Sequence, residues 1–358
     1  MCKGSIKVSY YFPSPFKQVD LPKTISPQLI NCLNSGKSAL KTLLKSLDLP
    51  VKSKIAIPAY VCSDVMSSVE SEFLVPVLFD LKDDRTFWTE YNFSKILEEN
   101  IKAIILVHLH GFIHPDTEQI ANFCKKNYIC LIHDAAQSYG IDEEKLTESN
   151  GIIYSFGPGK STSAAGGGWI KSKTGIAGLK VIKNSSVFSF ENVKAKFFFK
   201  SRLFGYRFSR VELIGNSFIN VISNSSTGIH NMTQFQKQAA SGILASLNEV
   251  SVLRKKRYSI IKDKIRDNKN ISLAYDDGKG QYFKAVVYVN NNPDKFSDYL
   301  SKNEIPFFSL VKKIDPEKLS SEPLNNFKKN ARLLFEISTE TSIPEKEIER
   351  VATVLASY

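Results

Sequence analysis

Lys160 is the residue of this sequence whose surroundings most clearly suggest chemistry. It lies in residues 154–170, Tyr-Ser-Phe-Gly-Pro-Gly-Lys-Ser-Thr-Ser-Ala-Ala-Gly-Gly-Gly-Trp-Ile, where apolar residues flank a run of small ones. The pattern predicts a strand, an open loop and a second strand, and a loop with so few bulky side chains lets a ligand lie close to the backbone. Lys160 carries the only reactive amine in this loop. The alternative interpretation is an ordinary solvated lysine, which describes most lysines in proteins.

Two Gly-Lys-Ser triplets, at residues 36–38 and 159–161, suggest the phosphate-binding loop of nucleotide hydrolases. That loop requires another glycine five positions before the glycine of the triplet. Asn31 and Tyr154 occupy those two positions, so neither triplet completes the motif. The sequence therefore argues against nucleotide hydrolysis.

Asp134 is the second residue that suggests chemistry, because it follows the apolar run 129–132. A carboxylate at the end of a strand in a half-buried pocket is neutralised by desolvation unless a cation lies opposite. The protonated pyridine nitrogen of pyridoxal phosphate (PLP) is such a cation, and Lys160 would supply the Schiff base that this cofactor requires. A helix that begins at Gly36, Lys37 and Ser38 would offer N–H groups to the phosphate, with the Lys37 ammonium and the Ser155 hydroxyl as further donors.

Short apolar strands alternate with helices in the part of the chain that would position these residues. We expect the first helix of this part to start at a Ser-Gly turn at residues 35–36. Strands are predicted at 54–58, 74–79, 103–107 and 128–132, and helices at 63–71 and 117–126. This alternation is typical of a mostly parallel sheet covered on both faces, which binds its ligand beyond the carboxyl ends of the strands.

The composition is that of an ordinary globular protein. The chain has 358 residues, of which 42% are hydrophobic and 23% charged, and a length-based prior gives about two domains. We expect a cytoplasmic protein, because no apolar run has the length of a membrane span and the N-terminus lacks the features of a secretion signal. The five cysteines are scattered without a CxxC pair, so neither a disulfide framework nor a metal site is expected. The net charge of +12 favours an anionic partner.

The motifs together resemble one family. They are Ser35-Gly-Lys-Ser-Ala-Leu40, Ile57-Pro-Ala-Tyr-Val61, Val107-His-Leu-His-Gly111, His133-Asp-Ala-Ala-Gln137 and Ser155-Phe-Gly-Pro-Gly-Lys160. In this order and spacing they are similar to the DegT/DnrJ/EryC1/StrS family of PLP-dependent aminotransferases, over roughly residues 30–355. The resemblance implies fold type I: a large α/β domain with a mostly parallel seven-stranded-type sheet, and a smaller C-terminal α+β domain.

The resemblance also implies roles for individual residues. Lys160 matches the Schiff-base lysine, which also moves the proton between the substrate carbon and the cofactor, and Asp134 matches the aspartate that pairs with the pyridine nitrogen. Gln137 matches a glutamine that contacts the ring or its 3-oxygen, and Ser155 matches the phosphate-binding serine. Family members that are dehydratases carry histidine at the lysine position, so Lys160 favours transamination.

Several positions depart from the family pattern. An aromatic residue usually stacks on the cofactor, but Val61 and Cys62 occupy the aligned pair, so stacking is assigned to Cys62 or to the neighbouring Tyr60. Ile229 occupies the position of an asparagine that reaches the phosphate of the partner subunit, and Asn231 replaces an arginine. Lys37 stands where threonine is usual, and our hypothesis is that it compensates for the altered phosphate contact.

The predicted organisation is an N-terminal arm at 1–24, a large PLP-binding domain at 25–250 and a small domain at 251–358. Within the large domain, residues 171–228 are rich in Lys, Arg and Phe, and Glu191 is the only acid between Lys171 and Arg210. We interpret residues 194–210 as an amphipathic packing or dimer-interface helix. A weak contact with a membrane surface is the alternative interpretation of this segment.

These observations predict an enzyme that transfers an amino group from an amino acid, glutamate by resemblance, to a keto-sugar nucleotide. The resemblance implies a homodimer with active sites at the interface, and a product used for surface polysaccharide or secondary metabolites; no nucleic-acid partner is expected. Two alternatives remain open. One is a diverged PLP-binding protein that acts on another amine or is regulatory, and the other is a protein on the same fold that binds membranes or nucleic acid.

Overall fold

The computed structural model describes residues 26, 32–141, 143–157, 159–164, 166–172, 228–308, 323–341 and 343–358 of the chain. The predicted arm at 1–24 and the basic segment 194–210 lie outside these residues, and so does nearly all of the wider segment 171–228. Of the residues proposed for the cofactor site, all ten lie within the described part.

The larger sheet has six strands within the described residues, in the order β2-β1-β3-β4-β5-β6. The strands are β1 (Lys54–Pro58), β2 (Val75–Phe79), β3 (Ala103–Val107), β4 (Cys130–Asp134), β5 (Gly151–Ser155) and β6 (Gly168–Lys171). The first five are parallel, and β6 pairs antiparallel with β5, with Ser155 opposite Gly168. The mostly parallel sheet is confirmed.

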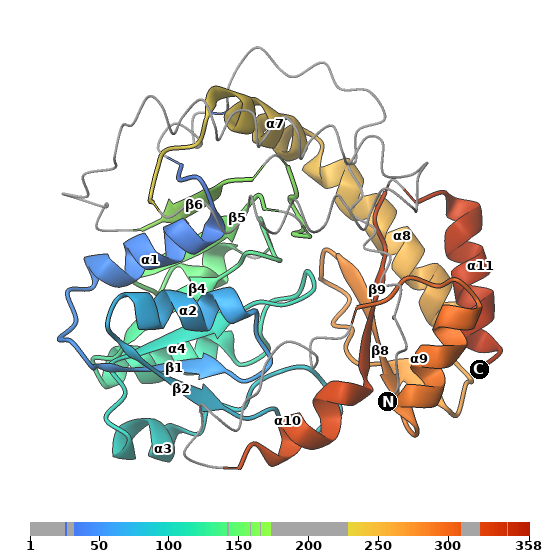
Figure 1. Cartoon of the computed structure of the whole chain (residues 1–358), viewed down its shortest axis with the longest axis horizontal. Coiled ribbons are helices and arrows are strands. Elements are labelled where there is room, and N and C mark those ends of the chain that lie inside the picture. The colour runs from blue at the N-terminus through green and yellow to red at the C-terminus, as the bar shows by residue number, and fades with distance from the viewer. Residues whose placement is uncertain are drawn as a thin grey trace, which may run out of the picture.

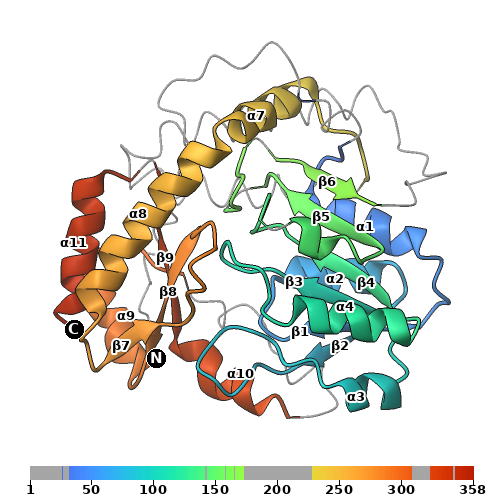
Figure 2. The same ribbon diagram turned by 180° about the vertical axis from the view of Figure 1, so that it is seen from behind.

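Helices cover both faces of the larger sheet. Alternate residues of its buried strands point to opposite sides, so each strand packs against helices on both faces. Residues 103 and 105 of β3 pack in one apolar cluster with α1 (Gly36–Ser46) and α2 (Ser63–Ser71). Residues 104 and 106 pack in another with α3 (Phe93–Glu98) and α4 (Thr117–Lys126). In Figure 1, α1 and α2 lie in front of the sheet, whereas α4 comes to the front in the reverse view of Figure 2.

A second, antiparallel sheet has the order β7-β8-β9. Its strands are β7 (Ile271–Leu273), β8 (Lys284–Val289) and β9 (Leu334–Ser338), and its neighbouring helices are α9 (Pro293–Lys302), α10 (Asn325–Asn330) and α11 (Glu345–Ala356). Two short 3-10 turns complete the described elements, at Glu143–Leu146 and Ala331–Leu333. The second sheet and its neighbouring helices form the smaller α+β unit that the sequence predicts.

Two consecutive helices join the two sheets. Helix α7 (Gln234–Ala245) starts at a capping box in which Thr233 and Gln236 hydrogen-bond each other's backbone, and α8 (Leu247–Ile265) continues from it. Figures 1 and 2 show α7 beside the large sheet and α8 running on to β8 and β9. We therefore propose that the domain boundary, predicted near residue 250, falls within the first turn of α8.

The positions of the predicted elements agree closely with the structure. The strands at 54–58 and 103–107 and the helices at 63–71 and 117–126 have the predicted bounds, and the strand predicted at 128–132 starts and ends two residues later. Among the described helices, none combines the length and apolarity that a membrane span requires.

Candidate active site

The residues singled out in the sequence lie at the carboxyl ends of the central strands. Asp134 is the last residue of β4, and Ser155 is the last residue of the adjacent β5. Because β4 and β5 are parallel, both residues lie at the same edge of the sheet, as expected for a ligand site in such folds. Lys160 lies in the connection from β5 to β6.

Asp134 is a buried carboxylate, with only 5% of its surface exposed. Its Oδ1 atom accepts a hydrogen bond from the Ala136 N–H at 3.0 Å. Burial raises the pKa of Asp134 above its usual value, while the positive charge of Lys160 and the Ala136 N–H act in the opposite direction. Because burial has the largest effect, the carboxylate is only partly compensated, and an additional cation opposite it would be stabilising.

The Lys160 loop is held by its own hydrogen bonds. The Ser163 N–H donates to the Lys160 carbonyl at 3.0 Å, and the Thr162 hydroxyl donates to the Ser155 carbonyl at 3.0 Å. Lys160 itself is half-buried, and its charge acts on Asp134. The structure therefore brings the predicted amine and the predicted carboxylate into one electrostatic environment, although 25 residues separate them in the chain.

The N-terminus of α1 lies against Ser155. A Cβ atom added to Gly36 would lie 2.7 Å from the Ser155 hydroxyl oxygen, which leaves room only for glycine. Ser35 caps the helix, because its side chain accepts from the Ser38 N–H at 3.0 Å. The N–H groups of the first helical turn have no partner inside the helix, so this end of α1 and the hydroxyl of Ser155 form a set of donors suited to an anion.

The glycines after Lys160 serve contacts within the protein. A Cβ atom added to Gly168 would lie 2.3 Å from the Ser35 carbonyl oxygen, and one added to Gly167 would lie 2.5 Å from Met232 Cε. Gly167 also has a φ of 122°, which favours glycine. The small residues of this stretch, which the sequence suggested as a place for a ligand to approach, therefore allow β6 to pass the cap of α1.

Gln137 has a defined amide orientation. Its Oε1 atom accepts from the backbone N–H of His110 at 2.9 Å, and because a backbone N–H can only donate, the oxygen must face it. The amide nitrogen is then turned the other way and can donate to an acceptor. This orientation agrees with the predicted contact between Gln137 and an oxygen atom of a cofactor ring.

Tyr60 lies in a buried cluster that connects the two sheets. Its hydroxyl donates to Glu336 Oε1 of β9 at 3.4 Å, and its ring meets His110 edge-on with the centroids 6.3 Å apart. Lys284 of β8 forms an ion pair with the other carboxylate oxygen of Glu336. Burial raises the pKa of Tyr60 and lowers that of His110 to about 4. Tyr60 is 1% exposed, so stacking on a cofactor stays a prediction for it.

The remaining predicted positions lie around the end of α1. Cys62 is half-buried and precedes α2 without capping it through its side chain. Lys37 is exposed, and its Nζ atom lies 3.4 Å from Asp64 Oδ1 in the first turn of α2. The backbone of Asn231 pairs with Leu33, two residues before the cap of α1. Contacts of these three residues with a cofactor stay predictions.

A chain of buried histidines lies beneath Asp134. The His114 N–H donates to His108 Nδ1, so the proton of neutral His108 is on Nε2, which lies 3.0 Å from His133 Nδ1. Burial lowers the pKa of all three, to about 4 for His114 and about 3 for His133. These histidines are therefore neutral, buried residues that hydrogen-bond within the protein.

Sequence reasoning missed Arg254, a charged residue that contacts the site from outside, and its partner Glu340. Arg254 of α8 donates to the Ser161 carbonyl, beside Lys160, and pairs with Glu340, which follows β9. Neither residue is predicted from the sequence pattern above. Arg254 lies four residues after Val250 and four before Tyr258, on the buried face of α8. This helical spacing is the signal that could have identified Arg254.

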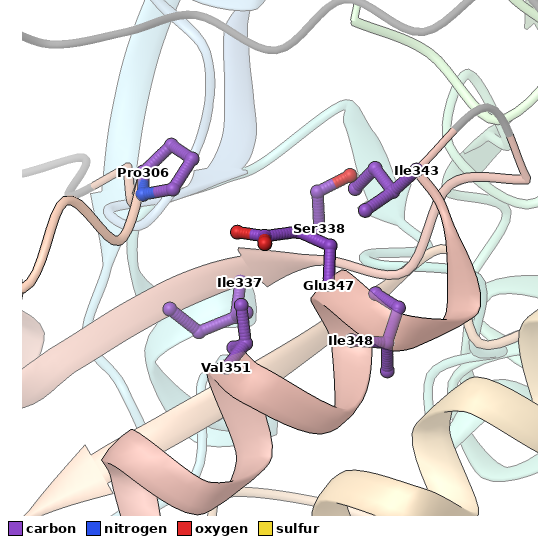
Figure 3. A pocket seen from close by; sticks show the side chains of 7 residues that line it. All are labelled: Pro306, Ile337, Ser338, Ile343, Glu347, Ile348 and Val351. Carbon is purple, nitrogen blue, oxygen red and sulfur yellow. The ribbon is translucent and has the colours of Figure 1, made fainter.

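No cluster of metal-binding side chains occurs among the described residues. A separate pocket lies between β9 and α11, and Glu347 is the one ionisable residue among the described residues that line it (Figure 3). The rest of its lining is mostly apolar and consists of Pro306, Ile337, Ser338, Ile343, Ile348 and Val351. None of these described lining residues is a predicted site residue, and none carries an amine side chain.

The donor set at the edge of the large sheet fits PLP. Asp134 is a buried anion whose charge is only partly compensated, Lys160 is an amine within its electrostatic range, and Gln137 is oriented to donate. The end of α1 with Ser155 offers donors to a phosphate. In the lysine loop, the buried hydroxyl of Ser161 has no hydrogen-bond partner within the described part of the chain. These are the groups that would hold the ring, the aldehyde carbon and the phosphate of the cofactor.

Comparison with known proteins finds sugar aminotransferases among the relatives of this chain. A curated relative, dTDP-4-dehydro-2,3,6-trideoxy-D-glucose 4-aminotransferase of Saccharopolyspora spinosa, is 28% identical over 113 residues, which is 31% of this chain. The match spans only 29% of that relative.

Two solved structures share the fold. S. venezuelae DesV in complex with a ketimine intermediate has a TM-score of 0.69 at 16% identity. The match covers 91% of this chain and 84% of the DesV chain. NtdA from Bacillus subtilis with bound cofactor PMP has a TM-score of 0.66 at 18% identity and covers 91% of this chain and 72% of its own. The fold is that of the fold type I PLP enzymes. The model of the DegT/DnrJ/EryC1/StrS aminotransferase family matches residues 30–310. The chain therefore belongs to the DegT/DnrJ/EryC1/StrS aminotransferase family.

Proposed function

We propose that this chain is a PLP-dependent aminotransferase that moves an amino group from an amino acid to the keto group of a nucleotide-linked sugar. The proposal depends on one observation: Lys160 and Asp134 lie at the same edge of the larger sheet, where the charge of Lys160 acts on Asp134. Family membership supports the reaction, and the dTDP-keto-sugar named for the curated relative supports the class of acceptor. Glutamate is the donor that the resemblance implies.

Each of the predicted residues has a distinct task in this proposal. When bound, PLP supplies an electron sink for the carbon that loses or gains a proton. Lys160 would hold the cofactor through its amine and would move a proton at the reacting carbon. Asp134 keeps a proton on the pyridine nitrogen, because a buried carboxylate favours a cation beside it. Ser155 and the end of α1 orient the phosphate.

The overall reaction balances between its two substrates. The amino acid leaves as a keto acid and the sugar ketone becomes an amine, so no external oxidant or reductant is needed. We propose a homodimer as the working form, supported by the family resemblance. Because Ile229 and Asn231 depart from the family pattern, the phosphate contact from the partner subunit would be altered, and Lys37 would compensate for it. Light scattering of the purified protein would measure its mass in solution.

The test begins with the purified chain and PLP. We expect visible absorbance from a covalent lysine–cofactor linkage, and we expect Lys160→Ala and the charge-preserving Lys160→Arg to lose it. The second stage adds glutamate and a dTDP-linked 4-keto sugar and measures the keto acid and the amino sugar. Failure to take up PLP would overturn the proposal. Uptake without an amino-sugar product would instead favour the alternative of a PLP enzyme acting on another amine.

A further inference from the structure

Helix α8 carries two arginines on its buried face. Arg254 and Arg257 lie among Val250, Tyr258 and Ile261, which pack toward the interior. Arginine is almost never fully buried unless it is paired, because removing its charge from water is costly. The partners of the two arginines therefore indicate why each is buried.

Arg257 binds the backbone of a single turn. Its Nη2 atom donates to the carbonyls of Thr341 and Ile343, at 3.0 and 2.6 Å, and its Nη1 atom donates to the carbonyl of Glu340. These bonds shape the segment between β9 and α11 that carries the Glu340 side chain. Arg257 therefore has a structural role within the smaller unit.

Arg254 contacts both units of the chain. Its Nη2 atom donates to the Ser161 carbonyl at 2.8 Å and to Glu340 Oε1 at 2.6 Å. The Arg254 and Glu340 side chains are 2% and 5% exposed, so water competes little for these bonds. The guanidinium also lies over the Phe283 ring, with its Cζ atom 5.3 Å from the centroid.

The target of Arg254 is the carbonyl group of Ser161, the residue that directly follows Lys160. Hydrogen bonds among the described residues of the loop and β5 also hold it, as in the bond from the Ser163 N–H to the Lys160 carbonyl. Arg254 adds a charge-assisted bond from a different element, and such bonds are among the stronger ones in proteins. Glu340 in turn fixes the guanidinium that makes it.

We propose that Arg254, held by Glu340, is a positioning residue that fixes the backbone of the Lys160 loop to the smaller unit of the protein. The inference rests on the proposed function only in taking Lys160 as the amine that binds the cofactor. In this proposal, the Arg254–Glu340 pair makes no contact with the reacting atoms. It acts through the Ser161 carbonyl on the direction in which Lys160 presents its amine.

Hydrogen exchange of the cofactor-free protein tests the structural part without any activity. In Arg254→Gln we expect the amides of Ser163 and Ala164 to exchange about tenfold faster or more, because a hydrogen bond to a charged group is lost from this loop. The matched control is Lys256→Gln on the same helix, which breaks only the exposed ion pair with Glu345 and should leave these amides unchanged.

The effect on Lys160 is tested with bound PLP. We expect the pH at which the lysine–cofactor absorbance titrates to shift in Arg254→Gln, and kcat to fall by roughly 100-fold with a smaller change in KM, since a displaced reacting group costs rate more than binding. Arg254→Lys should restore part of both. Glu340→Gln, which keeps the shape of the side chain, should change both in the same direction as Arg254→Gln and should fold even if that variant does not.

Two results would overturn the inference while leaving the proposed function intact. One is unchanged exchange of the loop amides in both Arg254→Gln and Glu340→Gln, with wild-type absorbance. The other is a raised KM for the amino acid at unchanged loop exchange, which would assign the guanidinium to the substrate. If the wild type takes up no PLP, the proposed function fails, whereas the exchange result still decides whether Arg254 holds the loop.

Discussion

The candidate site has a phosphate end, proposed to hold the cofactor phosphate, and a ring end, proposed to hold the cofactor ring. The two ends are built in different ways. At the phosphate end, the donors are backbone N–H groups of α1 and the hydroxyl of Ser155, packed so closely that Gly36 and Gly168 admit no side chain. At the ring end, Asp134 is a buried carboxylate, and Gln137 is oriented by the loop that carries His110. One end depends on close backbone packing, and the other depends on buried charge and on contacts with the smaller sheet.

This difference matters for how each end tolerates change. Backbone donors at a helix end keep their positions as long as the packing around them is intact. Buried charges depend on partners, and removing one partner leaves the other uncompensated. We therefore expect the ring end to respond to loss of charge, and the phosphate end to respond to added volume.

The largest effect is expected for Asp134→Asn at the ring end. Because the substitution keeps the shape but removes the anion, PLP binding should weaken by about 3–5 kcal/mol, or more than 100-fold, as when one partner of a buried ion pair is lost. Titration of the apoprotein with PLP, followed by absorbance, measures the change. Tenfold weaker binding or less would show that this end does not depend on buried charge.

Gly168→Ala should cause the next largest effect, at the phosphate end. The new Cβ atom would lie 2.3 Å from the Ser35 carbonyl oxygen, which belongs to the backbone and cannot rotate away. We expect a loss of about 1–3 kcal/mol in the free energy of unfolding, typical of overpacking, measured by urea denaturation. Gly157→Ala is the control, because its Cβ would lie 3.2 Å from the movable Ser155 hydroxyl. Equal losses in the two variants would argue against a tight backbone contact at Gly168.

The buried histidines at the ring end predict a dependence of stability on pH. The pKa is about 4 for His110 and His114 and about 3 for His133, below the usual 6.5. As the pH falls from 6.5 toward 4, the unfolded chain binds protons that the folded chain does not, so the free energy of unfolding should decrease. Urea denaturation across this range measures the slope.

Asp134 and Glu340 act in the opposite direction, because burial raises the pKa of both carboxyl groups and the folded chain binds their protons more readily. The decrease on acidification should therefore be steeper in Asp134→Asn and in Glu340→Gln than in the wild type. Stability that rises as the pH falls toward 5 in both variants would contradict the assignment of the histidines as neutral buried residues.

The smallest effect is expected for Lys37→Thr at the phosphate end. The Lys37 side chain is 41% exposed and pairs with Asp64, whose side chain is 64% exposed, and such surface pairs contribute at most about 1 kcal/mol. We expect the affinity for PLP to change less than about threefold. A larger loss would support the hypothesis that Lys37 compensates for the altered positions 229 and 231.

Much of the large unit could be predicted because its signals are local. The apolar strand 103–107 and the helix 117–126 are evident from their patterns, and Asp134 and Lys160 follow strands at positions where such folds bind ligands. The cap at Ser35 could likewise be located from a Ser-Gly turn before an apolar helix.

The contacts between the units could not be predicted in the same way. Arg254 and Ser161 are far apart in the sequence, and a buried arginine looks like any other basic residue until the phase of its helix is known. The Tyr60–Glu336 contact has the same character, since it joins a strand end of one sheet to a strand of the other. Their partners become apparent only when the two sheets are placed together.

The antiparallel pairing of β5 and β6 has a consequence for how the chain finds its correct alignment. Ser155 lies opposite Gly168, and the loop between them carries Lys160. A slip of β6 by one residue against β5 would bring Gly167 or Trp169 to the Ser35 carbonyl in place of Gly168. An indole has no room where even one added carbon would lie 2.3 Å from that oxygen. Steric exclusion at Gly168 therefore prevents the slip toward Trp169 during folding, and helps to fix the position of the Lys160 loop relative to the sheet.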